Sequence, residues 1–291
     1  MRNKGAEVVE GNLDNPLSLT AAFAAANVIF AVTKMIDGAT EREVTQGKNI
    51  ANAAAGIPTL EKFIWSTLPS ASTISQGRIP VPHMDGKAQV DEYILKSQPA
   101  LARKAMFLWG GFYAENVQYP NFVFHALGDS GKYVWIQLVR DGTVVPMVGD
   151  HNSNIGTIVE RMLERPDICP PMTYVLAVTD WMEHGELLRM WAQLVGEKNG
   201  MKIEPIYVHS DLEVVDRLWP SLGKEMGLML KVLDLLGKEA WSKKDAKIVT
   251  LQDLELEVGT DLVSTEMAVR KLAAATEVPV KSRETKGSAQ L

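Results

Sequence analysis

Short runs of apolar, β-forming residues recur along the first half of this 291-residue chain, each followed by a helical segment. The clearest run is Val28–Val32, and similar runs return at Glu61–Trp65 and Ala105–Leu108. Apolar runs without polar alternation are typical of strands that are buried on both faces of a parallel sheet. Helical patterns at Glu41–Ala55 and Asp85–Ser97 separate these runs. The alternation predicts an α/β fold with a parallel sheet and right-handed crossovers.

The remaining segments complete this pattern less regularly. A strand is predicted at Glu7–Gly11, followed by a helix from Pro16 to about Ala25, for which Asn15 is a suitable N-cap. The tail from Val278 is charged and rich in small residues, which is typical of disorder. Further strands are predicted at 121–127, 133–139 and 174–178, and further helices at 154–164, 181–195 and 214–236, the last interrupted at Pro220.

Composition narrows the class of protein. The net charge of −6 argues against a broad basic face for nucleic acid. The single cysteine, Cys169, cannot form an internal disulfide, which favours a reducing compartment. No apolar run approaches the roughly 20 residues of a membrane span, and the histidines lack the spacing of a zinc site. We therefore expect a cytoplasmic protein, with the nucleus as an open alternative, and no nucleic-acid, membrane or metal partner.

Polar segments follow the first predicted strands, at the points where these strands end. They are Gly11–Asp14, Thr33–Met35 and Ser66–Leu68. Ligands of open parallel sheets bind beyond the carboxyl ends of the strands. The sequence therefore predicts that these segments surround one binding site.

Several motifs, in the same order along the chain, resemble the NmrA-like family, an atypical branch of the short-chain dehydrogenases. GAEVVEGNLD, residues 5–14, is similar to a strand and turn that the family typically writes GVEVVxGDLxD. VPHMDGKAQVDEYI, residues 81–94, resembles the segment with the active-site lysine, here Lys87. GGFYAEN, residues 110–116, resembles the family's PGFYMEN turn. With segments 18–32, 47–70 and 146–156, the resemblance spans about residues 5–272.

The resemblance implies a Rossmann-like, doubly wound parallel sheet that binds NADP or NAD, with a smaller C-terminal substrate lobe over the cleft. This fold would occupy residues 1–277, with the core at about 1–116, 146–180 and 247–277 and the lobe at about 117–145 and 181–246. Residues 278–291 would form a disordered tail. The implied cofactor-binding residues are Asn12, Leu13, Asp14, Thr33, Lys34, Ser66, Thr67, Lys87, Gly111, Phe112, Tyr113 and Asn116.

The chain departs from the family at the phosphate-binding end. Family members begin with a strand, a GxxGxxG loop and a helix, but this chain opens at what resembles strand three, as if truncated at its N-terminus. Because that loop supplies donors to the pyrophosphate, we expect reduced dinucleotide affinity. Asn12 replaces a family Asp and either contacts adenine or only closes a turn. Trp109–Gly110 replaces Arg-Pro, which predicts a looser turn.

The proton-transfer positions also depart from the standard Tyr-x-x-x-Lys pattern, because His83 stands where Tyr would be. This is similar to the NmrA-like pattern, and a histidine can donate or accept a proton near pH 7. Alternatively, His83 caps the following helix or faces solvent. The resemblance implies that Lys87 holds the nicotinamide ribose or assists proton transfer, and the alternative is a surface lysine. Ser66 and Thr67 are expected to contact ligand rather than act as nucleophiles, and Lys34 contacts the cofactor or is solvated.

Two functions therefore remain open. The first is an NAD(P)-dependent oxidoreductase that acts on an organic intermediate of secondary metabolism, with NADP(H). The second is a non-catalytic redox-sensing regulator that binds dinucleotide or a protein partner. The missing tyrosine favours the second, and the frequent assignment of family members to pathway oxidoreductases favours the first.

Overall fold

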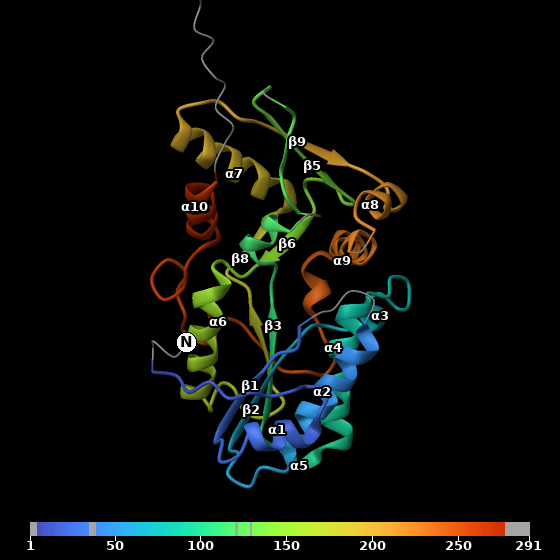
Figure 1. The fold of residues 1–291 in the computed structure, drawn as a ribbon, viewed down its shortest axis with the longest axis vertical. Coiled ribbons are helices and arrows are strands. Elements are labelled where there is room, and N and C mark those ends of the chain that lie inside the picture. Colours follow the sequence, from blue (N-terminus) through green and yellow to red (C-terminus); the bar gives the residue numbers. More distant parts are fainter. Residues whose placement is uncertain (1–4, 35–38, 120–121, 129, 221, 277–291) are drawn as a thin grey trace, which may run out of the picture.

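The protein is elongated, with a layered α/β region at one end and a lobe at the other (Figure 1). The computed structural model describes residues 5–34, 39–119, 122–128, 130–220 and 222–276. In these ranges no helix has the length and apolar character that a membrane crossing requires. The predicted disordered tail lies outside them.

One parallel sheet organises the layered region. Its strands are β1 (Val28–Ala31), β2 (Lys62–Thr67), β3 (Ala105–Gly110), β7 (Tyr174–Ala177) and β10 (Ile248–Val249). They lie in the order β1-β2-β3-β7-β10, and every pairing is parallel. This confirms the predicted α/β fold with a parallel sheet.

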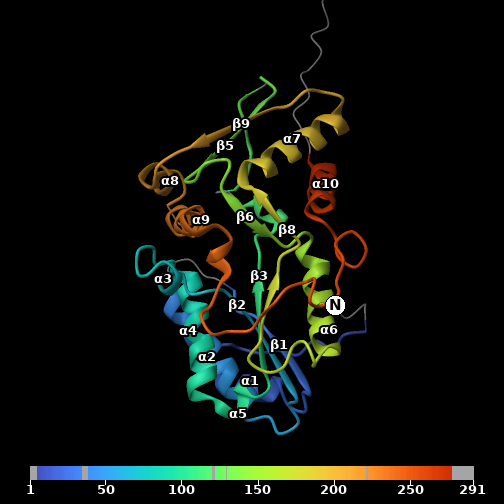
Figure 2. The ribbon, with the colours of Figure 1, turned by 180° about the vertical axis from the view of Figure 1, so that it is seen from behind.

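Helices cover the two faces of this sheet unequally (Figures 1 and 2). One face packs Phe63 and Trp65 into the apolar cluster of the helices on that side, and the other packs Ile64 and Met106 against α6. The more heavily covered face carries α1 (Pro16–Ala22), α2 (Thr40–Ala55), α4 (Pro82–Ser97) and α5 (Pro99–Ala102), and the opposite face carries α6 (His151–Glu164).

The prediction that Val28–Val32 is buried on both faces is wrong. Ile29 and Ala31 are buried, but Val28, Phe30 and Val32 are 43%, 41% and 56% exposed. These three side chains lie on the sheet face that carries α6. That helix covers the centre of the sheet but does not cover β1. Since β1 pairs only with β2 among the described strands, its outer edge is also open.

The predicted strand at Glu7–Gly11 is wrong as well. Residues 6–12 form an irregular, exposed segment that pairs with no described strand. Val8 and Val9 are adjacent and both are exposed, so no apolar face is available to hold the segment against a sheet. The helix that follows is confirmed, since the Asn15 side chain caps α1 by accepting from the backbone N–H groups of Leu17 and Ser18.

Several element boundaries differ from their predictions. Helix α4 begins at Pro82 rather than Asp85, because proline suits the first helical position and the Asp85 carboxylate accepts from the backbone N–H of Val81. The short helix α3 (Ala71–Ile74), which the sequence pattern did not indicate, precedes α4. Trp181 and Met182 belong to a strand, β8 (Asp180–Glu183), rather than to a helix, because they pair with β6 (Val144–Met147).

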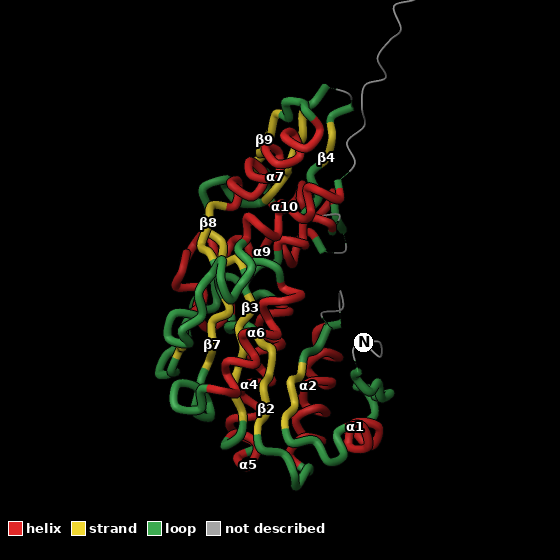
Figure 3. The backbone as a smooth tube through the Cα atoms, turned by 90° about the vertical axis from the view of Figure 1, so that its left-hand side faces the viewer, coloured by secondary structure: helices red, strands yellow, loops and turns green. Residues whose placement is uncertain are grey.

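The lobe lies beyond the carboxyl ends of the central strands (Figures 1 and 3). Its three-stranded sheet contains β4 (His125–Ala126), β5 (Lys132–Gln137) and β9 (Glu204–His209). Helix α9 (Gly223–Leu236) connects it to the layered region, since α9 contacts both α4 and β6. The remaining elements are η2 (Ala114–Gln118), α7 (His184–Asn199), α8 (Leu212–Leu218), η3 (Gly237–Trp241) and α10 (Thr265–Ala275).

Candidate functional site

A cavity of about 450 Å³ lies where β1, β2 and β3 end, beneath α9. This is the edge of the sheet at which the sequence predicts a ligand. The cavity brings together most of the predicted site residues: Thr33, Lys34, Ser66, Thr67, His83, Lys87, Gly111, Phe112, Tyr113 and Asn116. Asn12, Leu13 and Asp14 do not line it.

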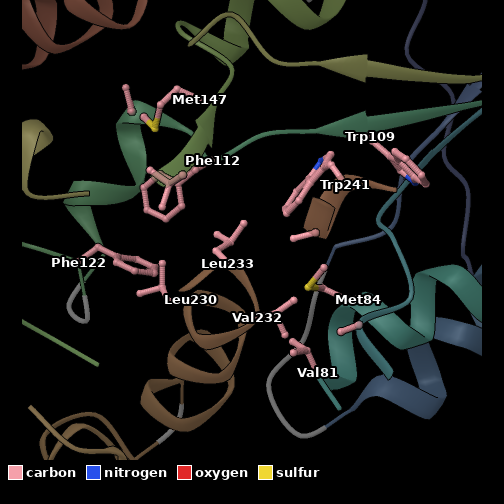
Figure 4. Packing of buried hydrophobic residues seen from close by; sticks show 14 of the residues in the cluster. Val81, Met84, Trp109, Phe112, Phe122, Met147, Leu230, Val232, Leu233 and Trp241 are labelled. Atoms are coloured by element: carbon pink, nitrogen blue, oxygen red, sulfur yellow. The ribbon is translucent and has the colours of Figure 1, made fainter. Parts of the chain in front are cut away.

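The roof of the cavity is apolar. Met226, Met229 and Leu233 of α9 line it together with Trp241 of η3. Figure 4 shows Leu230 and Leu233 of α9 turned toward Phe112 and Phe122. The two phenyl rings pack edge to face, with centroids 5.0 Å apart. The cavity therefore combines a polar floor at the strand ends with an apolar roof.

Lys87 is held in a buried polar cluster on the floor. Its ammonium nitrogen lies 2.8 Å from Glu43 Oε1 and donates to the backbone oxygen and to Oγ1 of Thr33, at 3.1 and 3.0 Å. The Thr33 hydroxyl in turn donates to Glu43 Oε1 at 2.7 Å. An ammonium group has three donors, so these partners take up all of them. Lys87 is therefore not a surface lysine. A ligand must compete with Glu43 and Thr33 for its ammonium donors.

His83 is buried and paired. Its Nδ1 lies 2.8 Å from Glu225 Oε1, and its backbone N–H donates to the same oxygen at 2.7 Å. Burial raises the pKa of Glu225, but the hydrogen bonds and charge of His83 outweigh burial and lower it overall. The prediction that His83 faces solvent is therefore wrong. The His83 side chain does not cap the helix either. Instead, the Glu225 carboxylate accepts from the His83 backbone N–H and so caps the N-terminus of α4.

Thr67 connects the floor to a buried acid. Its hydroxyl donates to Asp91 Oδ1 at 2.6 Å, and Asp91 is enclosed between α4 and the sheet. Burial raises the pKa of Asp91 to about 8, against opposing contributions from the Thr67 hydrogen bond and the charge of Lys243. At neutral pH Asp91 is therefore protonated, and the Thr67 hydroxyl donates to its Oδ1.

The turn after β3 is fixed by backbone contacts. Phe112 N–H donates to Pro146 O at 2.6 Å, and Val148 N–H donates to Phe112 O at 3.1 Å. A Cβ on Gly111 would lie 2.9 Å from Pro146 O, so only glycine fits this approach. The turn is consequently held against β6, and the predicted looseness of Gly110–Gly111 is wrong.

Tyr113 presents a second proton-bearing group to the cavity. Its ring stacks on His151, with centroids 4.4 Å apart. Burial raises the pKa of the Tyr113 phenol, and the charge of Glu115 and the Tyr119 phenol raise it further. The phenol therefore stays protonated at neutral pH and can donate a hydrogen bond.

Three predicted cofactor-binding residues, Asn12, Leu13 and Asp14, bind the N-terminal segment to its neighbours. The Asn12 side chain accepts from the Asp14 N–H at 2.9 Å, which closes a turn. Leu13 O accepts from Asn49 Nδ2, and Asp14 binds Arg42 and Gln46. A cofactor role for these residues stays a prediction.

A potential metal-ligand group lies behind Tyr113. Glu115, Asp150 and His151 present ligand atoms that all lie within 4.8 Å of one another. His151 Nδ1 lies 2.9 Å from Glu115 Oε2, whereas Asp150 pairs with Lys271 and caps α6. The sequence could not indicate this group, because Glu115 is distant in the chain from the other two residues.

The NmrA-like family profile matches residues 1–269. The chain belongs to the NmrA-like family. The negative transcriptional regulator NmrA in complex with NADP has 16% identity and a TM-score of 0.66, over 92% of this chain and 81% of that chain. The triphenylmethane reductase of Citrobacter sp. with NADP(H) has 16% identity and a TM-score of 0.62, over 93% and 85%. An NADPH-dependent quinone oxidoreductase from Escherichia coli has 12% identity and a TM-score of 0.64, over 93% and 85%.

These NmrA-like neighbours share the Rossmann-like fold with this chain.

Three acidic residues, Glu43, Asp91 and Glu225, are the partners of cavity residues Lys87, Thr67 and His83. Sequence reasoning missed all three. Glu43 lies in the first turn of α2, where an acidic residue is usually interpreted as a favourable helix N-terminus. Glu225 joins the site only through tertiary packing, and no local pattern could indicate it.

Proposed function

We propose that this NmrA-like protein binds the nicotinamide end of NADP(H) or NAD(H) in the cavity beneath α9 and acts as an oxidoreductase on an organic intermediate. The observation that supports this most directly is the meeting of His83, Lys87 and Ser66 at the strand ends under an apolar roof. Convergent polar groups within an apolar pocket are typical of small-molecule and cofactor sites.

The floor and the roof fit different parts of such a ligand. Ser66 and Asn116 offer a hydroxyl and an amide group to a ribose and a carboxamide, and both line the cavity. Met226 and Met229 offer an adaptable apolar surface to an organic substrate. The nicotinamide half of a dinucleotide therefore fits the residues that are present.

The pyrophosphate half has fewer partners. The sequence contains no GxxGxxG loop beside a strand. Lys87 is engaged by Thr33 and Glu43, and Lys34 is the other lysine of the described cavity wall. Among the described cavity residues, Lys34 therefore remains as the lysine that a phosphate could engage.

A bound NAD(P)H would supply a hydride to the substrate. The chain's own residues would orient and protect this step. Lys87 and Thr33 would fix the ribose side, while Leu233 and Phe112 would exclude water. The substrate oxygen that gains negative charge would need a proton donor, and His83 and Tyr113 are the candidates that line the cavity.

Calorimetric titration with NADPH and NADP⁺ tests this proposal. We expect NADPH to bind the unmodified protein. Ser66→Leu, which fills the floor, should weaken binding roughly tenfold or more, whereas Ser130→Leu on the exposed β4–β5 turn should not. Equal affinity in both variants, with folding verified by circular dichroism, would rule out this cavity as the dinucleotide site.

A non-catalytic sensor is the second candidate. The observation that favours it is the absence of a tyrosine at position 83, combined with the engagement of Lys87 by Glu43 and Thr33. A sensor should bind NADP⁺ and NADPH with different affinities and oxidise no NADPH in the presence of an acceptor. If the folded protein binds neither form, its role would be in contacts with other proteins.

A further inference from the structure

A hydrogen-bonded pair beside the cavity, His83 and Glu225, joins the two parts of the molecule. His83 belongs to the first turn of α4 in the layered region, and Glu225 belongs to the first turn of α9 in the lobe. Their side chains are only 6% and 13% exposed. A pair at this depth is shielded from solvent screening, so its geometry and charge matter more than those of a surface pair.

One carboxylate oxygen receives both contacts from His83. Glu225 Oε1 lies 2.7 Å from the backbone nitrogen and 2.8 Å from Nδ1. The backbone contact fixes the carboxylate, and the fixed carboxylate then orients the ring. When the imidazole is neutral, its Nδ1 carries the hydrogen, because a carboxylate can only accept. Nε2 is therefore the ring nitrogen left for a ligand.

We propose that Glu225 is a positioning residue, which holds His83 so that Nε2 can deliver a proton to a substrate bound beneath α9. This rests on the proposed oxidoreductase function. Its logic is that of a buried carboxylate behind a catalytic histidine, which fixes the tautomer and stabilises the imidazolium. The lowered pKa of Glu225 keeps this carboxylate charged at neutral pH.

The proton balance of the step is simple. Reduction of a carbonyl or quinone by NAD(P)H adds a hydride to the substrate and leaves one oxygen with negative charge. The doubly protonated His83 gives its Nε2 proton to that oxygen. The neutral ring retains its Nδ1 hydrogen on Glu225 and regains the Nε2 proton from water.

Two variants separate positioning from simple helix capping. Glu225→Gln keeps an oxygen that accepts from Nδ1 and from the backbone but loses the charge, whereas Glu225→Ala loses both. Glu213→Gln, an exposed acid in the first turn of α8, is the matched control. His83→Asn assigns the ring signals, and the chain has only five histidines.

The first readout is the imidazole tautomer, measured by ¹⁵N NMR. We expect neutral His83 to carry its hydrogen on Nδ1 in the unmodified protein and in Glu225→Gln. Glu225→Ala should shift it toward the Nε2–H form. An Nε2–H tautomer in the unmodified protein, or an unchanged tautomer in Glu225→Ala, would overturn the proposal.

The second readout is NADPH oxidation with menadione as the probe acceptor. Glu225→Gln should lower kcat about 100-fold while the Kd for NADPH stays unchanged, as in Glu213→Gln. A loss of kcat in Tyr113→Phe but not in Glu225→Gln would overturn the proposal in favour of the Tyr113 phenol. Failure of the unmodified protein to bind NADPH would instead remove the proposed function, and the tautomer result would still decide whether Glu225 orients His83.

Discussion

Strands β1 and β3 belong to the same parallel sheet, yet only β3 is enclosed on both faces. Every β3 residue from Ala105 to Trp109 is buried, whereas alternate residues of β1 are exposed. Both sequences are almost wholly apolar, so composition does not explain the difference. What differs is the cover: α6 lies over the centre of the sheet and leaves β1 open. Burial of a strand is thus decided by its neighbours, and the candidate site lies at the strand ends between the open edge and the enclosed centre.

The largest expected effect is a loss of packing at the enclosed centre. Phe107 is fully buried and stacks on Tyr174, with ring centroids 4.6 Å apart. Phe107→Ala should lower the free energy of unfolding by about 4 kcal/mol. Phe30→Ala, the same change at the open edge, should cost less than about 1.5 kcal/mol. Denaturant unfolding measures both, and equal losses would contradict the comparison.

A smaller loss is expected at the buried ion pair beside the site. Glu43 and Lys87 are 4% and 11% exposed in their side chains. Glu43→Gln should destabilise the protein by about 3 kcal/mol, the lower end for a broken buried pair, because Lys87 keeps two hydrogen bonds to Thr33. The double variant Glu43→Gln/Lys87→Met should recover part of this loss in thermal unfolding. No recovery would show that Glu43 acts through contacts other than Lys87.

The pH dependence of stability should also separate the centre from the edge. Burial raises the pKa of Asp91 to about 8, above the value near 4 that it has in the unfolded chain. Between these values the folded protein holds a proton that the unfolded chain releases, so the free energy of unfolding falls as the pH rises. Asp91→Asn should reduce the fall between pH 5 and pH 8 by about 3 kcal/mol.

The edge carboxylate provides the control for this experiment. The Arg42 hydrogen bond, helped by Gln46, lowers the pKa of exposed Asp14. Asp14 is therefore ionised in both states across this window, and Asp14→Asn should leave the slope between pH 5 and pH 8 unchanged. A changed slope in Asp14→Asn, or an unchanged one in Asp91→Asn, would contradict this assignment of the titrating group.

The smallest effect on stability, and the clearest on association, is expected at β1 itself. Unpaired apolar edges promote contact with other chains. Phe30→Lys should leave the thermal midpoint within error and reduce self-association at high protein concentration, measured by light scattering. Lys62→Ala, on the neighbouring strand β2, is a matched change that leaves the apolar face of β1 intact. Unchanged scattering in Phe30→Lys would show that this edge attracts no partner chain.

The sequence predicted the sheet because periodicity and helix-start signals are local. Apolar runs located β2, β3 and β7, and Asn15-Pro16 located the start of α1. The sequence-based prediction failed at Trp181–Met182 because these residues pair with the distant strand β6. It failed at residues 7–11 because they pair with no described strand. For the site, strand ends and family motifs brought ten residues to one cavity. The partners Glu43 and Glu225 stayed hidden because their role depends on tertiary contacts.

The tryptophan in the roof of the cavity has an optical consequence. Trp241 is buried, and it lines the cavity together with Leu233 of α9 (Figure 4). Indole emission overlaps the absorption band of reduced nicotinamide, so a dinucleotide held under α9 would quench this residue by energy transfer and emit in its place. NADP⁺ lacks that band and would not. If the proposed site holds the dinucleotide, this signal would distinguish its two redox forms, and Trp241→Phe would give the share of this residue among the seven tryptophans.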